Sequence, residues 1–127
     1  MKTIIFLIVL LNILSCSIAK NNIIGEYGYE GENTIDSIII EKNNVYTHKI
    51  FNKEKKIMYI GKSKWKLEKG RITLLDFYTN EDYNLTEFLT DEQASKFLMT
   101  VSYPLHKKGK HYVIEANADE SIYYTKK

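Results

Sequence analysis

The chain has 127 residues, of which 44% are hydrophobic, and its 18 basic and 16 acidic side chains leave a formal net charge of +2. This composition is that of a folded globular protein and excludes an intrinsically disordered one. A charge so close to balance also lacks the strong basic excess of nucleic-acid-binding domains, so we expect no nucleic-acid partner.

The N-terminal segment has the pattern of a secretory signal peptide. Residues 4–14 are apolar except for Asn12, and Lys2 supplies a basic start. As a helix this stretch reaches about 17 Å, which is too short for a bilayer core of about 30 Å. The pattern therefore predicts that residues 1–15 are removed before the chain folds.

Cys16 is the only cysteine of the chain and directly follows this segment. The run Ile13-Leu14-Ser15-Cys16 resembles the lipobox of bacterial lipoproteins, in which the cysteine is acylated, for example with palmitate, and becomes the first mature residue. The resemblance implies a lipid anchor at Cys16, a tether over residues 16–22 and a location in the cell envelope, at the outer membrane of a Gram-negative bacterium. The alternative is ordinary cleavage after Ala19, which would leave a soluble secreted or periplasmic protein.

From residue 23 onward the sequence is typical of short strands separated by turns. Between residues 57 and 67, Tyr59 and Trp65 alternate with lysines, as in a half-buried antiparallel strand. Further strands are expected at residues 23–29, 34–41, 45–51, 71–78, 99–105, 111–115 and 122–125. We predict a single domain over residues 23–127, mainly β, in which an antiparallel meander of about eight strands is closed or nearly closed into a small barrel.

One segment departs from the strand pattern. Thr90 followed by Gln93 is typical of a capping box, and Ala94 and Phe97 fall on one helical face. We therefore predict a short helix over residues 91–98 that plugs or flanks one end of the sheet.

Four segments carry a family resemblance: Gly25-Glu26-Tyr27, residues 61–67, residues 70–74 and residues 123–127. With them the chain resembles small bacterial lipoproteins, similar to those of Bacteroidetes, that have a lipocalin-like, calycin-type β domain. The resemblance implies the barrel scaffold, and most proteins of this kind have no assigned activity. Because a fold does not determine a function, the activity has to be argued from individual residues.

The sequence offers little catalytic chemistry. It has no nucleophile elbow, phosphate-binding glycine loop or zinc-protease motif, so we expect neither an enzyme nor a cofactor. The weak candidates for a metal site are His106 and His111, which would face each other if residues 107–110 formed a hairpin loop. Three lysines in that loop repel a cation, so we expect an exposed hairpin tip without metal. His48 is expected to be a surface or rim residue.

Aromatic side chains are abundant, with ten tyrosines in the chain. The interior of an eight-stranded barrel holds side chains or one small ligand. Aromatic rings on inward strand positions are expected to fill it, which favours a packed core over an open ligand cavity. The side chains assigned inward are Tyr27, Tyr29, Phe51, Tyr59, Trp65, Phe77, Tyr103 and Tyr112.

Three classes of function remain. The first is a lipid-anchored interaction module that binds an envelope protein, as an immunity protein or inhibitor does. Its candidate docking surface is the row Lys62, Lys64 and Lys66, about 13 Å long at 3.3 Å per residue, although a solvated strand face is the simpler interpretation. The second class is a lipocalin-like binder of a small apolar ligand. The third is a structural component of the envelope.

Overall fold

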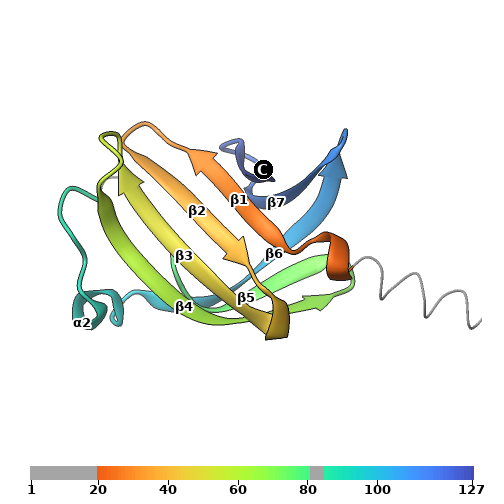
Figure 1. Cartoon of the computed structure of the whole chain (residues 1–127), viewed down its shortest axis with the longest axis horizontal. Helices are drawn as coiled ribbons and strands as arrows, with labels where there is room; N and C mark the ends of the chain where they lie inside the picture. The colour runs from red at the N-terminus through yellow and green to blue at the C-terminus, as the bar shows by residue number, and fades with distance from the viewer. Residues whose placement is uncertain (1–19, 81–84) are drawn as a thin grey trace, which may run out of the picture.

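The chain forms a closed barrel of eight antiparallel strands in the computed structural model, which describes residues 20–80 and 85–127 (Figure 1). The strands follow one another around the barrel in chain order, which confirms the predicted mainly-β meander. No helix in the described ranges is long and apolar enough to cross a membrane. The strands are β1 (Gly25–Glu30), β2 (Thr34–Ile40), β3 (Val45–Asn52), β4 (Ile57–Glu68), β5 (Arg71–Tyr78), β6 (Leu98–Lys108), β7 (His111–Asn117) and β8 (Ile122–Lys126).

The barrel closes where β1 pairs with β8 through two facing residue pairs. Lys127 extends this seam, because its backbone N–H donates to the Glu26 carbonyl at 2.9 Å and its ammonium group lies 3.0 Å from the Glu26 carboxylate. All strand pairings of the ring lie between Gly25 and Lys126. Residues 20–127 therefore contain the complete ring and its core.

The interior of the barrel is packed with side chains from the inward strand faces. Trp65 is 1% exposed, as the alternation in β4 predicts, and its indole N–H donates to the Glu41 carbonyl at 2.9 Å. This burial confirms the inward face of β4 and supports the expectation of a packed core. Other buried members of the same cluster are Tyr27, Ile38, Ile40, Tyr46, Ile72, Leu74, Phe77, Ile114 and Tyr124.

A β-bulge in β5 controls which side chains of that strand enter the core. Strict alternation after Leu74 would bury Asp76 and expose Phe77. The register with β6 instead shifts between Leu74 and Phe77, so Asp76 is exposed and Phe77 is buried. Asp76 adopts a φ of 47°, and the Leu75 carbonyl accepts a hydrogen bond from the Tyr46 hydroxyl at 2.5 Å.

The predicted helix is shorter than expected. The capping box between Thr90 and Gln93 is present, but α2 (Asp91–Ala94) ends after one turn. Leu98 already pairs with Tyr78 as the first residue of β6, so the chain must extend before the predicted end of the helix. Consequently Phe97, which we placed on the same helical face as Ala94, is 60% exposed, whereas Ala94 is buried. Helix α2 lies at the end of the barrel opposite the first described residues (Figure 1).

The inward assignment of Phe51 is also wrong. In β3 the inward side chains are Tyr46, His48 and Ile50, so the strand alternation places Phe51 on the outer face opposite Ile35. Thr47 shares this outer face, although it too is buried. The register between β3 and β4 shifts at the step from Ile50 to Phe51, near the end of β3.

Candidate functional site

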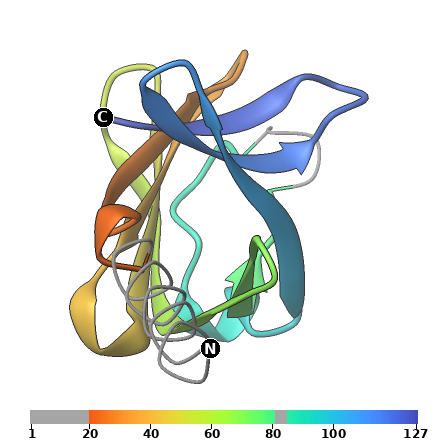
Figure 2. The same ribbon diagram turned by 90° about the vertical axis from the view of Figure 1, so that its right-hand side faces the viewer.

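One end of the barrel contains a pocket of about 560 Å³, which we call the mouth pocket. This is the end at which the described chain begins, and it faces the viewer in Figure 2. Three ammonium groups and one carboxylate, that of Glu68, stand beside a largely apolar wall, so the site combines apolar surface with a net positive charge. The apolar residues that line it are Ile23, Trp65, Leu67, Leu105 and Tyr112, and the lysines are Lys20, Lys66 and Lys69.

The mouth pocket exists because β4 extends beyond its partner β3. The pairing between β3 and β4 ends with Val45 opposite Lys64, whereas residues 65–68 pair only with β5. The inward side chain of Leu67 therefore has no facing residue on β3 and remains half-buried. The uncovered inner face of this strand end forms one wall of the pocket.

Positive charge at this end lies directly over aromatic rings. The Lys20 ammonium is 5.6 Å from the Trp65 ring centroid, and those of Lys107 and Lys126 are 5.1 Å and 5.9 Å from the Tyr112 ring centroid. Such cation–π contacts contribute about 0.5–1 kcal/mol at exposed sites. They hold the lysine head groups close to the apolar wall, where an anionic group of a ligand would meet them.

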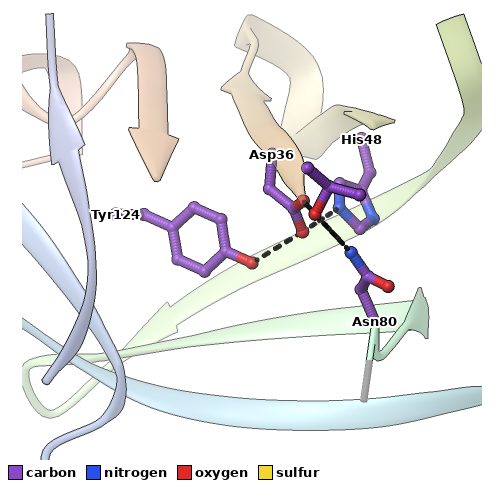
Figure 3. Close-up of polar contacts among 5 residues, drawn as sticks. Asp36, His48, Asn80 and Tyr124 are labelled. Carbon is purple, nitrogen blue, oxygen red and sulfur yellow. Dashed lines mark hydrogen bonds and ion pairs between the residues drawn. The ribbon is translucent and has the colours of Figure 1, made fainter. Parts of the chain in front are cut away.

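A second polar group lies inside the barrel, around the Asp36 carboxylate (Figure 3). Tyr124 donates its hydroxyl proton to this carboxylate at 3.2 Å, and the Asn80 side-chain amide donates to it at 3.3 Å. Thr34 accepts from the same amide at 3.1 Å and donates to Asp36 at 3.3 Å. Asp36 and Thr34 are 0% exposed, so this network is a closed polar core in which a buried carboxyl group is satisfied by hydrogen bonds.

His48 borders this network but contributes no hydrogen bond to it. Its Nε2 lies 3.6 Å from an Asp36 carboxylate oxygen, beyond hydrogen-bond distance, and neither ring nitrogen has a hydrogen-bond partner. The imidazole instead stacks on Phe77, with ring centroids 4.5 Å apart, and meets the edge of Tyr59. His48 is 1% exposed, so the expectation of a surface or rim residue is wrong.

Gly61 makes room for this arrangement of rings. It lies opposite His48 in the register of β3 and β4, and a Cβ at this position would overlap the Tyr59 hydroxyl. The Tyr59 ring therefore lies over the backbone of its own strand. Burial raises the pKa of the Tyr59 hydroxyl above its ordinary value, so this group remains protonated at neutral pH.

The two histidines considered for metal binding do not face each other. The β6–β7 turn is shorter than the predicted loop, because Lys108 pairs with His111 and His106 pairs with Val113. Both histidines are exposed and stand diagonally on the hairpin, and His106 lies 3.9 Å from Glu115. Within the described ranges, no cluster of three or more His, Cys, Asp or Glu side chains is arranged to hold a metal ion.

The other predicted site residues lie apart from the buried network. Lys62, Lys64 and Lys66 are exposed on the outer face of β4, and only Lys66 of the three lines the mouth pocket. Cys16 lies outside the described residues.

Sequence reasoning missed both the mouth pocket and the Asp36 network. The available signal for the network was Asp36, an acidic residue at an inward position of β2. The pocket depends on the unequal lengths of β3 and β4, which no local pattern reveals. In comparisons with family models, curated proteins and solved structures, the chain has no match. The functional argument therefore rests on the geometry of its own residues.

Proposed function

We propose that this chain is a non-catalytic binding module, attached to the bacterial cell envelope by a lipid at Cys16, and that its mouth pocket takes a small apolar ligand with an anionic group. The observation that carries this proposal is the pocket of about 560 Å³ with lysines beside its apolar wall. Ligand pockets commonly have volumes of about 300–1,000 Å³ and a few polar groups that fix the ligand's orientation. A fatty-acid-like molecule has this combination of chemistry.

The buried network supports a binding module over an enzyme. Asp36 and His48 are the residue types that carry acid–base catalysis, but they are 0% and 1% exposed. A general base must come within hydrogen-bond distance of its substrate, and these groups are enclosed by packed side chains. Their role is therefore to organise the core.

The test is a titration of purified residues 20–127 with dodecanoate below its micellar concentration. Trp65 is the only tryptophan of the chain and borders the pocket beneath Lys20, so a ligand that displaces Lys20 or packs beside the ring changes its fluorescence. We expect saturable binding of dodecanoate and weaker binding of dodecanol, which has the same tail without the charge. Absence of a saturable change in Trp65 fluorescence would overturn the pocket as a ligand site.

A pair of matched variants separates pocket binding from adsorption elsewhere. Leu67→Asn places an amide in the pocket wall and should weaken dodecanoate binding. Ile39→Asn makes the same change at a half-buried position on the outer face of β2 and should leave binding unchanged. Equal affinities of the two variants would show that dodecanoate binds outside the mouth pocket.

A second candidate is docking of an acidic envelope protein on the outer face of β4. It is favoured by the row Lys62, Lys64 and Lys66, whose side chains are all exposed and form no ion pair with another described residue. Once a partner has been captured from native envelopes, replacing the three lysines by Glu should slow association and reduce its salt dependence. Identical affinity and salt slope in both proteins would exclude this face. The geometry favours the mouth pocket, because a flat row of exposed charges offers no concave surface.

A further inference from the structure

The end of the barrel that holds the mouth pocket carries two further hollows, of about 410 Å³ and about 360 Å³. The larger one shares Tyr112 with the mouth pocket, and the smaller one shares Lys20 and Trp65 with it. The three hollows therefore form one continuous uneven surface across this end of the barrel.

This surface concentrates the positive charge of the molecule. Seven lysines line the three hollows, and Glu68 is the only acidic residue among their described lining. The rest of the chain contains eleven basic and fifteen acidic residues, so it is net negative although the whole chain is net positive. We call these seven lysines the basic rim: Lys20, Lys42, Lys66, Lys69, Lys107, Lys110 and Lys126.

Acidic residues gather at the opposite end of the barrel. The β1–β2 turn contains Glu32, helix α2 begins with Asp91 and Glu92, and the β7–β8 turn contains Asp119 and Glu120, all of them exposed. The same end also carries Lys53, Lys55, Lys56 and Lys96. Together with Glu30, Glu54 and Glu87, its described exposed acids outnumber these lysines by eight to four, so this end is net negative. The barrel is therefore an electrical dipole along its axis. Near a negatively charged plane, such a molecule is oriented with the basic rim toward the plane.

We propose that the basic rim is a docking surface for an anionic phospholipid bilayer, so that the barrel stands with its mouth on the membrane. The lysines pair with lipid phosphates, and the apolar wall of the mouth pocket opens toward the bilayer. This proposal goes beyond the proposed function, because it concerns the whole end face and holds without a ligand in the pocket.

The position of the first described residue agrees with this orientation. Lys20, the first described residue, belongs to the basic rim. Cys16 precedes it by four residues, which span at most about 14 Å when fully extended. A lipid on Cys16 would therefore hold the rim within reach of the bilayer surface. The charge of the rim is observed, whereas the tether rests on the lipid anchor of the proposed function, and both favour the same face.

The experiment measures sedimentation of residues 20–127, which lack the lipid anchor, with vesicles. One set consists of phosphatidylcholine and the other of equal parts phosphatidylcholine and phosphatidylglycerol. We expect binding only to the anionic vesicles, with loss of binding as salt is added. A lysine near an anionic surface contributes about fivefold in affinity, so Lys42→Glu, Lys107→Glu and Lys110→Glu together, none of which lines the mouth pocket, should weaken binding about a hundredfold or more.

The matched control reverses three exposed lysines toward the other end, Lys55→Glu, Lys56→Glu and Lys96→Glu, and gives the same net charge. It should bind the anionic vesicles like the parent. Equal loss of binding in both triple variants, or equal binding of the parent to both vesicle types, would overturn the proposal. Displacement by inorganic phosphate at millimolar concentration would also overturn it, because the rim would then be a site for free phosphate.

Failure of this proposal is distinguishable from failure of the pocket proposal. Leu67→Asn should lose dodecanoate binding and keep vesicle binding, whereas the rim variant should lose vesicle binding while Trp65 still responds to dodecanol. If Leu67→Asn abolished vesicle binding and the rim variant did not, apolar insertion would hold the protein on the membrane and the electrostatic docking proposal would be wrong.

Discussion

Asp36 and His48 lie side by side inside the barrel, with His48 Nε2 3.6 Å from a carboxylate oxygen of Asp36 and no hydrogen bond between them. The Asp36 carboxylate receives its hydrogen bonds from elsewhere, including Asn80, which follows β5, and Tyr124 in β8. These partners are 44 and 88 residues away in the chain. One buried carboxylate thus links three distant parts of the barrel.

Removing this carboxylate should destabilise the fold strongly. Asp36→Ala removes the carboxyl group that accepts from Tyr124, from Thr34 and, beside Thr34, from the Asn80 amide. Because each buried donor that loses a partner costs about 1–3 kcal/mol, we expect the free energy of unfolding to fall by about 3–5 kcal/mol. Tyr124→Phe removes one donor and should cost about 1–3 kcal/mol. Urea denaturation followed by circular dichroism measures both. A smaller cost for Asp36→Ala than for Tyr124→Phe would contradict the central position of the carboxylate.

Trp65 should be a major contributor to core stability. Trp65→Ala removes the largest fully buried side chain and its hydrogen bond to Glu41, so we expect a loss of about 3–5 kcal/mol. Trp65→Phe retains most of the volume and should cost less. Thermal and urea unfolding of the two variants give the comparison. A melting temperature of Trp65→Ala within a degree or two of the parent would show that the packing around this ring is misassigned.

Gly61 should tolerate no side chain, because the Tyr59 ring fills the space where a Cβ would lie. We expect Gly61→Ala to destabilise the barrel by about 1–3 kcal/mol, because the tyrosine ring has to move. In a Tyr59→Leu background the same substitution should cost less, since the overlapping hydroxyl and ring are gone. A double-mutant cycle measures this coupling, and additive costs would show that the overlap is not the cause.

Replacement of Cys16 tests the lipid anchor of the proposed function. Acyl chains contribute nominally about 0.8 kcal/mol per buried CH₂, so several chains anchor a protein durably. Cys16→Ala should move the protein from the membrane fraction to the soluble fraction or leave its precursor unprocessed. Cell fractionation and mass spectrometry of the mature N-terminus provide the readout. An N-terminus at Lys20 in the parent would establish cleavage after Ala19 and exclude lipidation.

The contact between Glu26 and Lys127 predicts an acid-sensitive seam. Hydrogen bonds from Lys127 and from Ser37 lower the pKa of the Glu26 carboxyl below its ordinary value of 4.5. Because the folded-state pKa lies below the unfolded-state pKa, the stabilisation is present above the unfolded value and is lost as pH falls through the folded value. Lys127→Met should raise the pKa of Glu26 toward 4.5, whereas Lys127→Arg should keep it low. NMR titration of Glu26 measures the shift, and identical pKa values in the two variants would exclude the proposed cause.

Much of the fold follows from local sequence pattern. Alternation in β4 identified the inward face of Trp65, and turn residues located the strand boundaries within a few positions. The capping box also placed the start of α2 correctly. Its end could not be predicted, because pairing between β5 and β6 determines where the helix stops and that pairing joins residues far apart in sequence.

The polar interior was harder to predict, because most of its hydrogen bonds join residues that are far apart in the sequence. Asp36 becomes a satisfied buried carboxylate only when Asn80 and Tyr124 meet it. His48 appears isolated in sequence, and its burial follows from stacking on Phe77, which a bulge turns inward. Local pattern does not encode such contacts. The mouth pocket was missed for a similar reason, since it arises from the difference between where β3 and β4 end.

The short seam between β1 and β8 has a consequence for the timing of folding. Its backbone contacts involve residues 26–28 on one side and residues 125–127 on the other, so the ring can close only when β8 is present. Until then, β1 has an unpaired edge that is open to other extended segments. A chain that emerges N-terminus first, from the ribosome or through a membrane, would expose this edge during its entire emergence. The edge of β1 therefore stays open to mispairing until β8 has been synthesised.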